Sequence, residues 1–116
     1  MTRATPIQLG VVIADAEAPR VAFDGSDRLR VEFLDYTGTE RVLVFEGVYG
    51  FRWQYADAEL LEGEPHDGAA VLHDSEWVAE LRRQGAVADS EQVEHYRLNF
   101  NATGSLEVAA AGWALG

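Results

Sequence analysis

The sequence predicts an α+β domain that is mainly antiparallel β-sheet, with one α-helix packed on it. Apolar and polar residues alternate in most segments, as they do in strands that bury one face. Turn-forming residues separate these segments, so neighbouring strands can pair as hairpins and as a meander. A single segment has helical spacing, and strands do not alternate with helices as they do around parallel sheets. We therefore expect about six or seven strands.

The whole chain, residues 1–116, is expected to form one domain. Its length is that of an ordinary domain, and a hydrophobic fraction of 47% suffices for one core. The absence of cysteine excludes disulfides, thiolate metal sites and a thiol nucleophile. The N-terminal apolar run is too short for a signal peptide, and no stretch is long enough to span a bilayer. These features favour a cytoplasmic protein without membrane contact, and the use of arginine without lysine suggests a bacterial source.

Turn signals fix the expected order of the strands. A DGSD turn at residues 24–27 precedes a clearly alternating segment, and Thr37-Gly38 turns that segment back as a hairpin. The returning strand, at about 40–46, is apolar on both faces and is expected in the interior of the sheet. The residues from Asn101 to Gly104 close the last hairpin. The expected strands are about residues 7–14, 20–24, 28–36, 40–46, 48–55, 94–101 and 105–111.

One helix is expected at about residues 75–84. Asp74 or Ser75 serves as its N-cap, since both side chains can accept a hydrogen bond from the first turn. Trp77 and Leu81 lie on the apolar stripe and are expected to dock the helix on the sheet.

The strand at 48–55 has one fully aromatic face, made of Tyr49, Phe51, Trp53 and Tyr55. The main expectation is that this face belongs to the core, under the helix. The alternative is a partly open face that binds a ligand or a partner, because Tyr and Trp are enriched at interfaces.

Negative charge is concentrated in the middle of the chain. The net charge is −11, and residues 57–94 hold eleven acidic residues against Arg82 and Arg83, a net of −9. The loop at 56–73 is long enough to suggest a function. This region is either a solvated surface or a docking surface for a basic protein, where opposite charge speeds encounter. The candidate partner-binding residues are Asp57, Glu59, Glu62, Glu64, Asp67, Asp74, Glu76 and Glu80.

The opposite face of the predicted sheet carries arginine. Cross-strand Arg–Glu pairs on a solvated face account for these residues. Because the net charge opposes phosphate binding, we expect no nucleic-acid partner. The residues are Arg28, Arg30, Glu32, Arg52, His95, Arg97 and Asn99.

Signatures of a metal or catalytic centre are weak. The candidate metal ligands His66, Asp67, His73 and Asp74 lack a spacing that fixes them on one helix face, so no metal or other cofactor is expected. Ser75, Ser90 and Ser105 all lie outside a Gly-x-Ser-x-Gly elbow, and no catalytic residue is assigned. The sequence favours a non-enzymatic protein but leaves the question of enzyme activity open.

Three segments resemble small uncharacterised bacterial β-rich domains, some of which look like immunity proteins of toxin systems. The segments are LRVEFLDYTGTERVLVFEGVYGFRW, DSEWVAELRRQG and HYRLNFNATGSLEVAA, and the resemblance extends over about residues 28–112. It implies one α+β domain and a protein partner, and it assigns no site residues.

Three hypotheses of function follow from the sequence. The first is a non-enzymatic interaction protein, immunity-like or accessory, that presents an acidic surface to a basic protein. The second is a small-molecule-binding or hydrolytic domain with a pocket beside the aromatic strand. The third is a structural subunit that self-associates as a homodimer.

Overall fold

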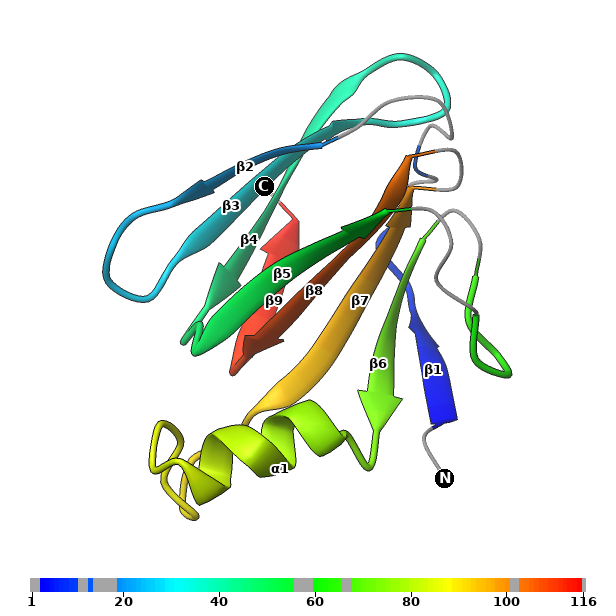
Figure 1. Cartoon of the computed structure of the whole chain (residues 1–116). Coiled ribbons are helices and arrows are strands. Elements are labelled where there is room, and N and C mark those ends of the chain that lie inside the picture. Colours follow the sequence, from blue (N-terminus) through cyan, green and yellow to red (C-terminus); the bar gives the residue numbers. More distant parts are fainter. Residues whose placement is uncertain are drawn as a thin grey trace.

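The computed structural model describes residues 3–10, 13, 19–55, 60–65, 68–100 and 103–115. Over these ranges the chain forms two antiparallel sheets that pack face to face, with a helix at one end of the first sheet (Figure 1). The first sheet has the strand order β1-β6-β7-β8-β5, and the second has the order β2-β3-β4-β9. The elements are β1 (Arg3–Ile7), β2 (Arg20–Phe23), β3 (Leu29–Leu34), β4 (Glu40–Glu46), β5 (Gly50–Tyr55), β6 (Ala69–His73), α1 (Glu76–Arg83), β7 (Glu94–Phe100), β8 (Gly104–Ala110) and β9 (Gly112–Leu115).

The core lies between the two sheets. Alternate residues of β3 are buried, as expected for a strand with one inward face. Phe33 of β3 meets Phe100 of β7 with ring centroids 6.3 Å apart, and Phe45 of β4 meets Tyr96 of β7 at 5.3 Å. The mainly antiparallel α+β class is therefore as predicted, but the strands form two sheets in place of one.

Of the chain's three passages between the sheets, the last two are adjacent corners. Residues 47–49 lead from β4 into β5, and Ala111 leads from β8 into β9. The backbone N–H of Ala111 donates to the carbonyl oxygens of Glu46 and Gly47, at 3.0 and 3.1 Å. Gly47 has a φ of 62°, and a Cβ at this position would lie 2.7 Å from the Cβ of Ala111. The corner therefore requires glycine.

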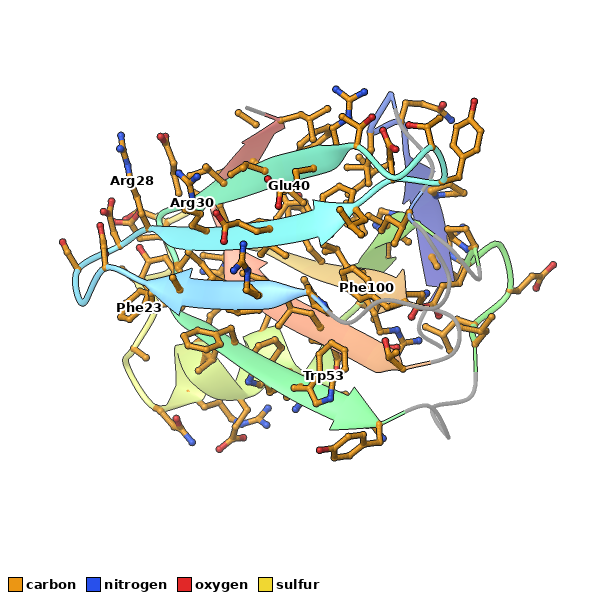
Figure 2. All side chains as sticks on the ribbon, turned by 90° about the horizontal axis from the view of Figure 1, so that it is seen from above. Phe23, Arg28, Arg30, Glu40, Trp53 and Phe100 are labelled. Atoms are coloured by element: carbon orange, nitrogen blue, oxygen red, sulfur yellow. The ribbon has the colours of Figure 1, made fainter. Side chains whose placement is uncertain are left out.

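Strands β2 and β5 are the edge strands on one side of the molecule. Phe23 of β2 and Phe51 of β5 approach each other there, with ring centroids 5.6 Å apart. Figure 2 shows Phe23 and Trp53 on this side, whereas Arg28 projects away from it. The inward side chains of the two edge strands therefore meet at the open border of the sandwich.

Three strands differ from the expectation. β1 shares only Ile7 with the predicted strand at 7–14, β6 lies in the predicted loop at 56–73, and β9 was not predicted. β1 is an edge strand, where Pro6 is tolerated. β6 is a short, alanine-containing run that is mostly buried, so it shows neither alternation nor strong strand propensity.

Helix α1 begins after Ser75, whose hydroxyl oxygen accepts a hydrogen bond from the Val78 N–H at 3.1 Å. The helix packs on the outer face of the first sheet through Trp77, which lies beside Gly50 and edge-on to the His95 ring. Every residue of α1 keeps some exposure to solvent. Over the described ranges, no helix is both long enough and apolar enough to cross a bilayer.

Candidate functional site

An apolar groove of about 650 Å³ lies at the open border between β2 and β5. The inward side chains of β5 are left partly uncovered because, within the described residues, β5 has a neighbouring strand on one side only. Phe51 is 42% exposed, Trp53 is 36% exposed and Tyr55 is 78% exposed. The apolar lining consists of Pro19, Val21, Phe51, Trp53, Tyr55 and Leu106.

Trp53 is the anchored ring of this groove. One part of its side chain packs against Phe100 of the core, with ring centroids 6.0 Å apart. The indole also lies on the backbone at Gly104, where a Cβ would come within 2.6 Å of the ring. Tyr55 stands edge-on to Trp53 at 6.5 Å. The core therefore fixes the indole while its exposed part lines the groove.

The expectation that the aromatic stripe belongs to the core is wrong for Phe51, Trp53 and Tyr55. These side chains point toward the second sheet, but at its open border, and Trp77 of α1 packs on Arg52 at the other face of β5. Tyr49 lies apart from the groove, half-buried, where burial and the neighbouring Glu91 raise the pKa of its phenol.

A second feature is a buried polar network on the outer face of the first sheet. The prediction of a solvated face is wrong for His95, Arg97 and Asn99, which are buried because α1 and residues 60–65 lie over the sheet there. The buried polar residues of this network are Glu64, His95, Arg97, Asn99, Ser105 and Glu107.

Glu64 is the centre of one half of this network. Its carboxylate pairs with the Arg97 guanidinium and accepts hydrogen bonds from Asn99 Nδ2 at 2.7 Å and from the Leu61 N–H at 2.9 Å. Burial raises the pKa of this carboxyl group, but the hydrogen bonds from Arg97 and Asn99 outweigh that effect and the pKa is lowered. The carboxylate is therefore ionised and fully satisfied.

Glu107 is the centre of the other half. Its Oε1 lies 2.7 Å from His95 Nε2, and its Oε2 accepts a hydrogen bond from Arg52 Nε at 2.9 Å. Burial acts to raise the pKa of Glu107, yet the hydrogen bonds from His95 and Arg52 lower it to about 2. Because the ionised carboxylate can only accept, we assign Nε2 of His95 as the donor of this hydrogen bond.

Ser75 extends this half of the network to the start of the helix. Its Oγ lies 2.7 Å from His95 Nδ1, which accepts the hydroxyl proton when the imidazole is neutral. A cleft of about 250 Å³ adjoins these groups, with Leu61, Leu72 and Trp77 as its apolar walls. The Arg52 guanidinium stacks on Trp77, 4.4 Å from the ring centroid. The cleft and the groove are thus on opposite faces of β5.

The predicted acidic surface is only partly assembled. Asp57, Glu59 and Asp67 lie outside the described residues. Glu64 is buried against Arg97, and Glu80 pairs with Arg83 on the helix surface. The acidic candidates that are exposed in the described part are Glu62, Asp74, Glu76 and Glu80.

Only two of the four candidate metal ligands, His73 and Asp74, lie in the described part of the chain. His66 and Asp67 lie outside the described residues. His73 Nε2 lies 2.6 Å from the Thr5 hydroxyl, and Asp74 is exposed. Over the described ranges, no three histidine or acidic side chains are grouped as metal ligands would be.

Sequence reasoning missed most of both sites. Pro19 and Val21 reach the groove from the second sheet, so only the packing of the two sheets brings them to Trp53. One signal was present for the network: pairing β7 with β8 places Arg97 opposite Glu107. That pairing follows from the predicted last hairpin.

A comparison of the chain with protein-family models, curated proteins and solved structures found no match.

Proposed function

We propose that the protein binds a small, apolar, ring-containing molecule in the groove between β2 and β5. The observation that carries this proposal is the exposure of Phe51, Trp53 and Tyr55 along one apolar groove of about 650 Å³. Ligand pockets for small molecules typically have volumes of about 300–1,000 Å³ and predominantly apolar walls. Contiguous apolar surface on a monomer often marks a binding site.

The lining indicates the chemical class of the ligand. The exposed rings of β5 offer surfaces on which a planar molecule can stack. Arg52 also borders the groove, but its guanidinium is paired with Glu107. Thr103 adds one hydroxyl group at the border. The described lining thus offers few polar partners and favours an uncharged ligand.

Titration with Nile red, an uncharged dye whose fluorescence rises in apolar surroundings, tests this proposal. The double variant Phe51→Ser/Tyr55→Ser removes two exposed rings and leaves Trp53 on the core. We expect its Kd to rise at least about tenfold, since each tenfold change corresponds to about 1.4 kcal/mol of binding. Tyr36→Ser is the matched control, because Tyr36 is 72% exposed and lies outside the groove lining.

Two results would overturn the proposal. The first is a wild-type protein that fails to bind the dye. The second is an equal Kd for the wild type and the double variant. An affinity lost equally in Tyr36→Ser would show that the dye binds any exposed ring.

The acidic docking surface and the homodimer remain predictions. The exposed carboxylates Glu62, Asp74 and Glu76 support the first, and the unpaired edges of β2 and β5 over the described ranges support the second. We prefer the groove to these two alternatives because several exposed apolar side chains meet in it.

A further inference from the structure

Ser75, His95 and Glu107 form a continuous chain of hydrogen bonds from a hydroxyl to an imidazole to a carboxylate. The Ser75 Oγ to His95 Nδ1 distance is 2.7 Å, and the His95 Nε2 to Glu107 Oε1 distance is also 2.7 Å. In this order a carboxylate orients the ring, the ring accepts the hydroxyl proton, and the hydroxyl oxygen becomes a nucleophile. The roles depend on this geometry and are independent of chain order.

The position of Ser75 suits a nucleophile. It lies at the junction between β6 and α1, beside the cleft of about 250 Å³. The residue before it, Asp74, has a φ of 55°, in the left-handed region that non-glycine residues seldom adopt. The N–H groups of Glu76 and Trp77 have no acceptor within the helix, because they belong to its first turn. They lie at the end of the helix that favours negative charge.

The surroundings hold the imidazole in place. Trp77 packs edge-on to His95, with ring centroids 5.0 Å apart and an interplanar angle of 76°. Arg52 fixes the second oxygen of Glu107, so the carboxylate cannot turn away from the ring. His95 and Glu107 are both at least nine-tenths buried, which restricts their motion.

We propose that Ser75, His95 and Glu107 form a hydrolytic centre for small carboxylic esters. This centre is independent of the ligand groove, since β5 separates the two. The apolar walls at Leu61, Leu72 and Trp77 accommodate a short acyl group, and the cleft volume limits its size.

The reaction proceeds in two balanced steps. Ser75 Oγ bonds to the ester carbonyl carbon while its proton passes to His95 Nδ1, and the first-turn N–H groups stabilise the negative oxygen. The ester C–O bond then breaks, and His95 returns the proton to the leaving alcohol. Water next bonds to the acyl carbon and gives a proton to His95. The bond to Ser75 Oγ breaks, Ser75 regains the proton and the carboxylic acid leaves.

Ser75 also has a structural role that the test must separate from catalysis. Its Oγ accepts the Val78 N–H at 3.1 Å and so caps the helix. Asp is an equally good N-cap but offers no hydroxyl nucleophile. Ser75→Asp therefore keeps the cap and removes the proposed chemistry, whereas Ser75→Ala removes both.

The experiment measures p-nitrophenyl acetate hydrolysis and covalent labelling by a fluorophosphonate, which reacts with activated serine hydroxyls. We expect the wild type to carry the label on Ser75, located by peptide mass spectrometry. Ser75→Ala and Ser75→Asp should both lose at least about 100-fold in hydrolysis rate. Ser90→Ala is the control, since Ser90 is exposed and is not among the residues that line the cleft, and it should react as the wild type does.

The roles of the other two residues have separate readouts. His95→Ala should lose hydrolysis, and added free imidazole should restore part of it beyond the rate at which imidazole alone cleaves the ester. Glu107 is a positioning residue. Glu107→Asp retains a carboxylate and should keep the fluorophosphonate label on Ser75, whereas Glu107→Gln should lose it. The proposal is overturned if the wild type shows neither hydrolysis above the buffer rate nor label on Ser75. It is also overturned if Ser75→Asp hydrolyses the ester as fast as the wild type.

Discussion

The outer faces of the two sheets carry the same kinds of charged residue in opposite environments. On the second sheet, the pairs Arg28–Glu46 and Arg20–Glu32 are exposed, with nitrogen–oxygen distances of 3.2 and 3.4 Å. On the first sheet, Arg97 is buried with Glu64 of the covering segment, and Glu107 is buried although its partner Arg52 remains half-exposed. Helix α1 and residues 60–65 account for the difference, because they cover only the first sheet.

This contrast shows that coverage sets the energetic role of a charge pair. Water screens an exposed pair, and its net contribution is small. A buried pair must satisfy every partner, because either charge left alone would lack both water and counter-ion. The buried pairs should therefore dominate the response to substitution and to pH.

The largest effect is expected from breaking the pair of Glu64 and Arg97. Glu64→Ala leaves the buried Arg97 guanidinium without its hydrogen-bonded carboxylate, with only Glu107 Oε1 nearby at 3.9 Å, and we expect a loss of about 3–5 kcal/mol in the free energy of unfolding. Urea unfolding followed by circular dichroism measures this loss. The double variant Glu64→Leu/Arg97→Met removes both charges, and its stability should lie closer to the wild type. A loss under about 1 kcal/mol in Glu64→Ala would show that water reaches Arg97 and that the two faces are alike.

The second largest effect is expected from acid, which should lower the free energy of unfolding through the buried carboxylates of the first sheet. The folded-state pKa of Glu107 is about 2, below the ordinary value of a glutamate, so the unfolded chain binds more protons. Its contribution is present above the unfolded pKa and is lost as pH falls from about 5 toward 2, by at most about 3 kcal/mol. The lowered pKa of Glu64 acts in the same direction, and the lowered pKa of Asp35 adds a like contribution at the turn after β3 of the second sheet. Urea unfolding across this pH range should show a shallower dependence for Glu107→Gln, and an unchanged slope would contradict the assignment.

Removing the Trp77 side chain, which packs over His95, should lower the free energy of unfolding by a smaller amount. Trp77 is half-buried, packs edge-on to the buried His95 ring and stacks under the Arg52 guanidinium. We expect Trp77→Ala to lower the free energy of unfolding by about 2 kcal/mol, less than for a fully buried aromatic ring. Thermal and urea unfolding measure the change. A loss as large as that of a core residue would mean that α1 belongs to the core.

The smallest effect is expected on the second sheet. Arg28 and Glu46 are both about three-fifths exposed. Glu46→Ala should change the free energy of unfolding by less than about 0.5 kcal/mol, and that change should shrink further in 1 M salt. A loss comparable with that of Glu64→Ala would remove the distinction between the two faces.

Local patterns in the sequence were sufficient for much of the fold. Alternation located β3 and β7, and the capping residues located α1 to within about one residue at each end. The strand β6 was missed because it lies between two other strands and is mostly buried. Its sequence therefore lacks the alternation of apolar and polar residues that marks a half-buried strand. The second sheet was missed because nothing local marks the corner at Gly47 as a crossing between layers.

The candidate sites depended on contacts between distant parts of the chain. The aromatic residues of β5 were recognised, but their exposure is set by the absence of a strand beyond β5 in the described structure. His95 and Ser75 are 20 residues apart, and Glu64 and Arg97 are 33 residues apart. Composition and spacing carry no information on such pairs until the packing is known.

The alternation of β5 also safeguards the accuracy of folding. A slip of one residue against β8 would turn Arg52 into the groove and place Trp53 beneath α1. Two contacts oppose that error from opposite faces: the indole fits only over Gly104, and Arg52 meets Glu107 only in the native register. An edge strand is held by one neighbour and is prone to misalignment. Here Trp53 and Arg52, which build the two sites, also favour the native register of β5, because a shifted pairing with β8 would lose the contact that each makes.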